Sequence, residues 1–207
     1  MPLSIRYSMF FCGLVLFGLG ISIAIEVQHL GLHPWDVLSV ALYDRFGMTI
    51  GFWGVAAGLV LIGVLLVSAR KYISIGTFLN ALTIGPIIDF FMWLDILPHA
   101  THTWVDYLII LCGITITGIG GGMYVAAGIG AGPRDGFMLS ISEKTGISVA
   151  KARILTESTV LILGLLLGGP VFIMSFIYTL IQSPVFQFSL QFFRKWTGKA
   201  APDRKAA

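Results

Sequence analysis

Long stretches without any charged residue are the feature of this sequence that most limits how it can fold. No Asp, Glu, Lys or Arg occurs in residues 158–193, and similar stretches recur along the chain. Charged residues make up only 11% of the 207 residues and apolar residues 57%, whereas a soluble domain carries about 25% charged residues. So few charges cannot cover a water-facing surface of this size. The sequence therefore predicts a membrane protein and excludes a soluble globular enzyme.

Six segments are long enough to cross a bilayer, which takes about 20 predominantly apolar residues. Residues 158–193 are too many for one crossing, and Gly168-Gly169-Pro170 divides them because Gly and Pro interrupt helices. We therefore expect an all-α polytopic membrane protein with six transmembrane helices. The expected spans are residues 5–27, 48–69, 72–94, 105–130, 149–167 and 171–193.

The positions of the basic residues predict the orientation of the chain, because Lys and Arg gather on the cytoplasmic side of a membrane. Most of them lie before the first span, between the second and third, between the fourth and fifth, and after the sixth. Both termini are therefore expected in the cytoplasm, with residues 196–207 as a basic cytoplasmic tail. Because the charges flank spans, the net charge of +3 indicates a lipid surface and not nucleic acid.

The sequence contains an internal repeat. Residues 31–36 (GLHPWD) resemble residues 130–135 (GAGPRD) at an offset of 99, and residues 44–47 match residues 143–146 at the same offset. At an offset of 98, Asn80 matches Tyr178 and Pro86 matches Pro184. The expected repeats are residues 1–97 and 98–195.

Each repeat holds three predicted spans, so the two repeats must enter the membrane from opposite sides. Such inverted three-helix repeats are common in transporters and channels. Between the first two spans of each repeat lies a segment too short to cross, residues 34–46 and 133–145. Each begins with Pro, which suits the first position of a helix. We therefore expect two half-helices, one entering from each side.

Several motifs together resemble a known family. They are the paired segments 31–36 and 130–135, the Gly-Thr-x-x-Asn of residues 76–80, and Arg153 followed by Glu157. In these the chain is similar to the YczE/YyaS/YitT family of bacterial membrane proteins, and most to its YczE-like branch. The resemblance covers nearly the whole chain up to the tail. It implies an integral, multi-pass protein of the bacterial plasma membrane and supplies no substrate.

Charged residues next to the half-helix starts form the first candidate site. The start of a helix can bind an anion through its N–H groups, and Arg134 beside Asp135 adds a positive charge there. The alternative is that Asp135 caps its helix while Arg134 faces lipid headgroups. In the first repeat Trp35 and Asp36 take the matching positions, and Trp35 is also suited to an interfacial anchor.

A second candidate pair lies in the fifth span. Arg153 and Glu157 are four residues apart and so share one helix face. An ionisable residue this deep in a span usually faces a cavity or a partner. The pair is therefore either an ion pair that ties the span to a half-helix or part of a solute or proton site.

Polar residues also form a stripe on each of two spans. Thr77 and Asn80 share one face of the third span, and Ser175, Tyr178 and Gln182 share one face of the sixth. Asn80, Tyr178 and Gln182 are candidates to line a polar pathway. Interhelical hydrogen bonds explain these stripes equally well.

The metal-ligating residue types near the end of the first span give a weaker signal. Glu26, His29, His33 and Asp36 would share a helix face, but Gly31 and Pro34 interrupt that helix. Solvated loop histidines are the favoured interpretation, so we expect no metal and no cofactor. His99 and His102 are predicted on the same outer side. The two cysteines, Cys12 and Cys112, are expected as small core residues.

No catalytic motif occurs, so we expect no enzymatic activity. The leading hypothesis is a transporter or channel for an unknown small solute or anion. The rival hypothesis is a membrane scaffold or regulatory protein that acts through a protein partner. The expected partners are the lipid bilayer and the solute, and a homo-oligomer is compatible with the sequence.

Overall fold

The computed structural model describes residues 2–197, which form eight α-helices, two short 3₁₀ turns and no β-strand. The helices are α1 (Leu3–Glu26), α2 (Pro34–Phe46), α3 (Ile50–Ser68), α4 (Ile75–Leu94), α5 (Val105–Ala126), α6 (Pro133–Thr145), α7 (Val149–Leu166) and α8 (Ile173–Thr197). The 3₁₀ turns are η1 (Gln28–Leu30) and η2 (Arg70–Tyr72). The expected all-α class is thus confirmed. Of the predicted basic tail, residues 198–207 lie outside the described residues.

Five of the described helices are long and apolar enough to cross a bilayer: α1, α3, α4, α5 and α8. The chain is therefore an integral, multi-pass membrane protein. Helix α7 is 18 residues long but carries Lys151, Arg153 and Glu157, and it is not among the five.

The two short helices occupy the ranges expected for the half-helices. Each begins with Pro, Pro34 in α2 and Pro133 in α6, where the missing N–H and fixed φ cost a helix nothing. Each is followed by a glycine with positive φ, 74° at Gly47 and 72° at Gly146. That conformation favours glycine and ends a helix. Local residue chemistry therefore sets both ends of both helices.

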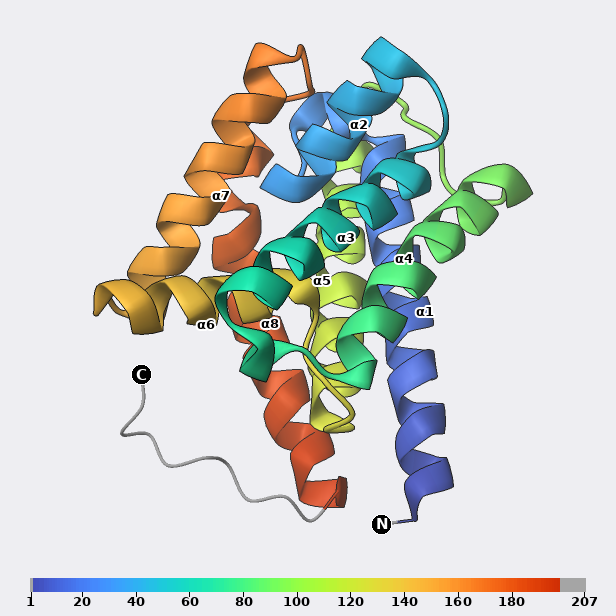
Figure 1. The fold of residues 1–207 in the computed structure, drawn as a ribbon. Helices are drawn as coiled ribbons and strands as arrows, with labels where there is room; N and C mark the ends of the chain where they lie inside the picture. Colours follow the sequence, from blue (N-terminus) through green and yellow to red (C-terminus); the bar gives the residue numbers. More distant parts are fainter. Residues whose placement is uncertain (1, 198–207) are drawn as a thin grey trace.

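Helices α1 and α5 pack against each other along much of their length at the centre of the bundle (Figure 1). Glycines make the approach possible. A Cβ atom at Gly13 would lie 2.6 Å from the backbone nitrogen of Tyr124, and one at Gly113 would lie 2.8 Å from the carbonyl oxygen of Gly20. Close backbone approach of this kind is how small residues stabilise helix pairs in membranes.

The other helices are arranged around this pair. Helix α4 packs on α1 and α3, and α8 packs on α5. The two short helices cross over between the halves of the chain, because α2 packs on α7 and α6 packs on α3. In Figure 1 the first turn of α1 and the last turn of α8 lie at the same end of the bundle, at the bottom of the view.

The outer surface of the bundle is strongly apolar, as a lipid-facing surface should be. Val67 on α3 is 92% exposed and Leu166 on α7 is 74% exposed. Cys12 and Cys112 are free and lie on this surface, so their expected place in the core was wrong. The reason is that lipid is as apolar as a protein core, so an apolar neighbourhood does not show which way a side chain faces.

Candidate functional site

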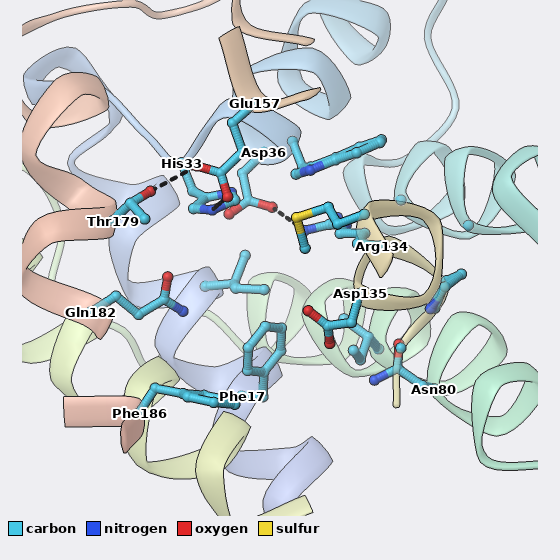
Figure 2. A pocket seen from close by; sticks show the side chains of 18 of the residues that line it. Phe17, His33, Asp36, Asn80, Arg134, Asp135, Glu157, Thr179, Gln182 and Phe186 are labelled. Carbon is cyan, nitrogen blue, oxygen red and sulfur yellow. Dashed lines mark hydrogen bonds and ion pairs between the residues drawn. The ribbon is translucent and has the colours of Figure 1, made fainter. Parts of the chain in front are cut away.

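A cavity of about 680 Å³ lies inside the bundle, where the starts of α2 and α6 meet α1, α3, α4, α7 and α8 (Figure 2). Its volume falls within the range of small-molecule sites, roughly 300–1,000 Å³. Most of the residues singled out in the sequence line it: Trp35, Asp36, Asn80, Arg134, Asp135, Arg153, Glu157 and Gln182. Tyr178 borders a neighbouring space of about 30 Å³. The structure thus brings together residues from both predicted repeats.

The starts of the two short helices contact each other across the cavity. Arg134 Nη1, in the first turn of α6, lies 3.8 Å from Asp36 Oδ1 in the first turn of α2. The same guanidinium lies over the Trp35 ring, with its carbon 5.1 Å from the ring centroid. Trp35 and Asp36 are buried. Arg134 therefore links the two predicted repeats through an ion pair and a cation–π contact.

Glu157 stands at the centre of a second polar group, formed by α7, α8 and the residue that precedes α2. The Thr179 hydroxyl donates a hydrogen bond to Glu157 Oε2 at 3.0 Å. Glu157 Oε1 lies 3.7 Å from His33 Nε2 and 3.9 Å from Arg153 Nε. Arg153 Nη2 in turn lies 3.7 Å from Asp135 Oδ1. Arg153 therefore connects α7 to the half-helix α6, as the first interpretation of this pair expected, and it also lines the cavity.

The two arginines of the cavity remain able to bind a ligand. Their distances to the carboxylates, 3.7–3.9 Å, are longer than hydrogen bonds. Each guanidinium carries five N–H donors in a planar fork that fits a carboxylate or phosphate group. Three carboxylates, Asp36, Asp135 and Glu157, share the same space. The site thus offers groups of both charge signs close to two helix starts, whose dipoles favour anions.

The helices that line the cavity at matched positions of the two predicted repeats differ in the side chains they supply. Apart from Asn80, helices α3 and α4 supply small or apolar residues, among them Gly54, Gly58, Ala81, Ile84, Gly85 and Ile88. At the same offsets of 99 and 98, helices α7 and α8 supply Arg153, Glu157, Thr179, Gln182, Ser183 and Phe186. Matched positions therefore line one cavity from two sides, and one wall is largely apolar while the other is largely polar.

The polar stripes on α4 and α8 divide into two roles. Thr77 forms a capping box with Ser74 at the start of α4, and the Ser175 hydroxyl accepts a hydrogen bond from the Leu32 N–H at 3.1 Å. These two residues therefore stabilise the fold. Asn80 Nδ2 and the Tyr178 hydroxyl are buried without a hydrogen-bond partner among the described residues. Such groups are rare in native proteins and call for an explanation.

The four residues Glu26, His29, His33 and Asp36 do not come together. Helix α1 ends at Glu26, the η1 turn follows, and Gly31 adopts a φ of 95° before α2 begins at Pro34. Glu26 then contacts His99, His29 contacts Asp106, His33 contacts Glu157 and Asp36 contacts Arg134. The interruption of the helix by Gly31 and Pro34 is the physical reason for this separation.

From the sequence, His33 was a candidate only as a metal ligand, and several other cavity residues were not predicted. His33 is the N-cap residue of α2 and lines the cavity beside Glu157. Thr179, Phe17, Tyr124 and Phe186 line it as well. For His33 and Thr179 a signal was available. His33 lies in the repeated segment 31–36, and Thr179 lies four residues after Ser175 and three before Gln182, next to the polar stripe. Nothing in the sequence separates the aromatic residues from those facing lipid.

A separate charged contact lies on the surface of the bundle. Tyr72 donates a hydrogen bond to Glu143 Oε2 at 2.7 Å, and Lys71 bonds to Glu143 Oε1. The hydrogen bond that Lys71 donates to Glu143 keeps the pKa of Glu143 below its usual value and raises the pKa of Lys71. This exposed contact holds the turn η2 to the end of α6.

These features define a class, a multi-pass α-helical membrane protein with a charged internal cavity. Residues 4–195 match the family model described as "Family of unknown function (DUF6198)", and the chain belongs to this family. The resemblance to YczE that the motifs indicated is confirmed by direct comparison. The chain is 37% identical to the uncharacterized membrane protein YczE of Bacillus subtilis over 188 residues, 91% of this chain and 86% of that protein.

Two further relatives match over most of their length. An uncharacterized protein of Haemophilus influenzae is 31% identical over 168 residues, covering 80% of this chain and 75% of the relative. The uncharacterized protein YyaS of Bacillus subtilis is 26% identical over 169 residues, covering 80% and 83%. No solved structure matches the chain.

Proposed function

We propose that the protein crosses the bacterial plasma membrane six times as two inverted repeats, with α7 as the fifth span in addition to the five apolar helices, and with both termini in the cytoplasm. Three observations support this. Matched positions of the two predicted repeats line one cavity. The short helices cross between the halves, α2 onto α7 and α6 onto α3. Arg153 and Glu157 face the cavity, while the opposite side of α7 exposes apolar residues such as Ile162 and Leu166.

We further propose that the cavity binds and transports a small organic solute with an anionic group and an apolar part. The observation that carries this proposal is the cavity of about 680 Å³ with Arg134 and Arg153 in its wall, where neither arginine forms a hydrogen bond with a carboxylate of residues 2–197. The anionic group fits these guanidinium groups and the two helix starts. The apolar part fits the wall formed by α3 and α4. No covalent step is part of the proposal.

Flux into liposomes tests this function. Purified protein is reconstituted and assayed with organic acids, amino acids and inorganic anions, and each solute is followed in both directions. We expect uptake of an organic anion that falls at least about tenfold in Arg134→Gln, since a hydrogen bond to a charged group contributes about 1.5–3 kcal/mol. Lys151→Gln is the matched control, because Lys151 lies on α7, is exposed and does not line the cavity.

Two results would contradict a transport function. One is the absence of flux and of binding for every solute class, together with a cellular phenotype that Glu157→Gln leaves unchanged. The other is equal loss in Arg134→Gln and Lys151→Gln. A phenotype that depends on residues 199–207, and on neither Arg134 nor Glu157, would instead support a membrane scaffold.

A further inference from the structure

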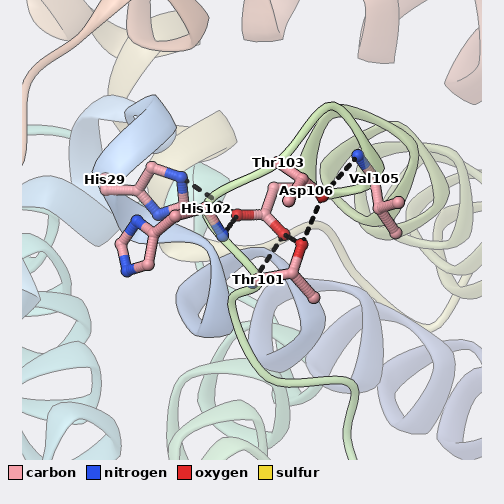
Figure 3. Close-up of polar contacts among 6 residues, drawn as sticks. All are labelled: His29, Thr101, His102, Thr103, Val105 and Asp106. Carbon is pink, nitrogen blue, oxygen red and sulfur yellow. Dashed lines mark hydrogen bonds and ion pairs between the residues drawn. The ribbon is translucent and has the colours of Figure 1, made fainter.

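A second polar cluster lies outside the cavity, where the turn η1 meets the loop between α4 and α5. His29 in η1, His102 in the loop and Asp106 in the first turn of α5 come together there (Figure 3). One ligand atom from each residue lies within 4.8 Å of the other two. Both histidines are exposed and Asp106 is fully buried. None of the three lines the cavity.

The carboxylate of Asp106 is fixed in place by the loop. The N–H and the hydroxyl of Thr101 donate to Oδ1 at 2.9 and 2.8 Å, and the N–H of His102 donates to Oδ2 at 2.8 Å. Outer hydrogen bonds of this kind orient the carboxylate ligands of metal sites. The carboxylate therefore presents Oδ2 to the two histidines with little freedom to move.

The two imidazole rings lie close enough to Asp106 to share one metal ion with it. His29 Nε2 lies 3.2 Å from Asp106 Oδ2, and the ring centroids of His29 and His102 are 4.6 Å apart. Tetrahedral ligands at about 2.0 Å from Zn²⁺ are about 3.3 Å from one another. The first pair therefore has the required spacing, and rotation of the exposed His102 ring brings in the third ligand.

Two features of His102 are not explained by the hydrogen bonds of the loop. The His102 ring has no hydrogen-bond partner among the described residues, although it lies against another imidazole. Its backbone has a φ of 54°, an uncommon conformation for a residue other than glycine. Residues kept in such conformations concentrate at functional sites. No Lys or Arg occurs in residues 95–106, so no basic residue of that loop opposes a cation there.

We propose that His29, His102 and Asp106 bind a divalent transition-metal ion of the Zn²⁺ type. Two imidazoles and one carboxylate are a common ligand set for such ions, and water fills the remaining positions. The bound ion joins η1, which leads into α2, to the loop between α4 and α5. This site is independent of the proposed transport function, because it shares no residue with the cavity.

Metal titration of the purified full chain tests the site. The protein carries an affinity tag without histidine, is stripped with a chelator and is titrated with Zn²⁺ by calorimetry. We expect one Zn²⁺ per chain with a micromolar or lower Kd, and a Kd at least about tenfold higher in His102→Gln. His99→Gln is the matched control, since His99 lies in the same loop, is exposed, and contacts Glu26 and Asp95.

His102→Gln is preferred to a change at Asp106, which the loop needs to fold. Its elution profile on size exclusion should match that of the unchanged protein, and His29→Gln should weaken binding as well. Wild-type binding that is only millimolar would overturn the proposal. Equal losses in His99→Gln and His102→Gln, or no loss in His102→Gln, would overturn it too.

Discussion

Glu157 shows how an ionisable residue in an apolar helix is compensated by polar partners. Glu157 has three, Thr179, His33 and Arg153, from α8, the N-cap position of α2 and its own helix. That Glu157 would need a cavity or a partner was predictable, because an isolated charge in a span is costly in any fold. That His33 would be one partner was not predictable, since the contact between His33 and Glu157 depends on the packing of α2 against α7 and on the backbone conformation at Gly31.

At the level of single residues, we expect the Tyr178 hydroxyl to lower the stability of the fold while it contributes to solute binding. The hydroxyl is buried without a partner beside a space of about 30 Å³, and an unpaired buried hydroxyl costs about 1–3 kcal/mol. Tyr178→Phe is therefore expected to leave the thermal unfolding midpoint in detergent unchanged or to raise it, while it weakens solute uptake. Tyr107→Phe, at an exposed tyrosine, is the control. A clearly lowered midpoint in Tyr178→Phe would show that the hydroxyl has a structural partner.

At the level of helices, the ends of an element were predictable from the sequence, but the direction in which its side chains face was not. The ends of α2 and α6 agree with the sequence because Pro34, Pro133, Gly47 and Gly146 act through their own backbone geometry. The direction in which an apolar helix faces was not predictable, as Cys12 shows. Lipid and protein interior both accept apolar side chains, so periodicity carries little information in these spans.

The contact between α1 and α5 gives a prediction about helices. Gly13→Ala should lower the thermal unfolding midpoint, because the added Cβ would lie 2.6 Å from the backbone nitrogen of Tyr124, which cannot turn aside. Overpacking of this kind costs about 1–3 kcal/mol. Gly63→Ala is the matched control on α3, where nothing lies within 4 Å, and it should be neutral or stabilising by up to about 1 kcal/mol. Similar midpoints for the two variants would refute a close α1–α5 contact.

For the whole molecule, a few identities and the charges of the loops predict a repeat, but they do not predict which residues would share one cavity. The sequence matches Asp36 to Asp135 and Gly58 to Glu157, but it does not show that such pairs face one common space. The division into an apolar and a polar wall emerges only when α3 and α4 are placed opposite α7 and α8. Contacts between segments far apart in the chain create this space, and local patterns do not record them.

The proposed six crossings make a prediction about the two ends of α7. In a chain with Cys12→Ser and Cys112→Ser, a single new cysteine is placed either at Lys144→Cys, before α7, or at Phe172→Cys, after it; both positions are exposed. A membrane-impermeant maleimide added to intact cells should label the Phe172 variant, and should label the Lys144 variant only after permeabilisation. Equal labelling of the two in intact cells would mean that α7 does not cross.

The packing of α2 on α7 also affects how the protein is made. Ribosomes add about 5–20 residues each second and release the N-terminal part first. Helix α2 packs on α3, which follows it directly, and on α7, which begins only at Val149, so α2 waits about 5–20 s for the α7 part of the surface that covers it. During this interval Trp35 and Asp36 lack the Arg134 contact as well, until α6 is made. The first half of the chain is therefore inserted before its contacts with α6 and α7 can form. In a nascent chain stopped before α7, the face of α2 that packs on α7 stays uncovered.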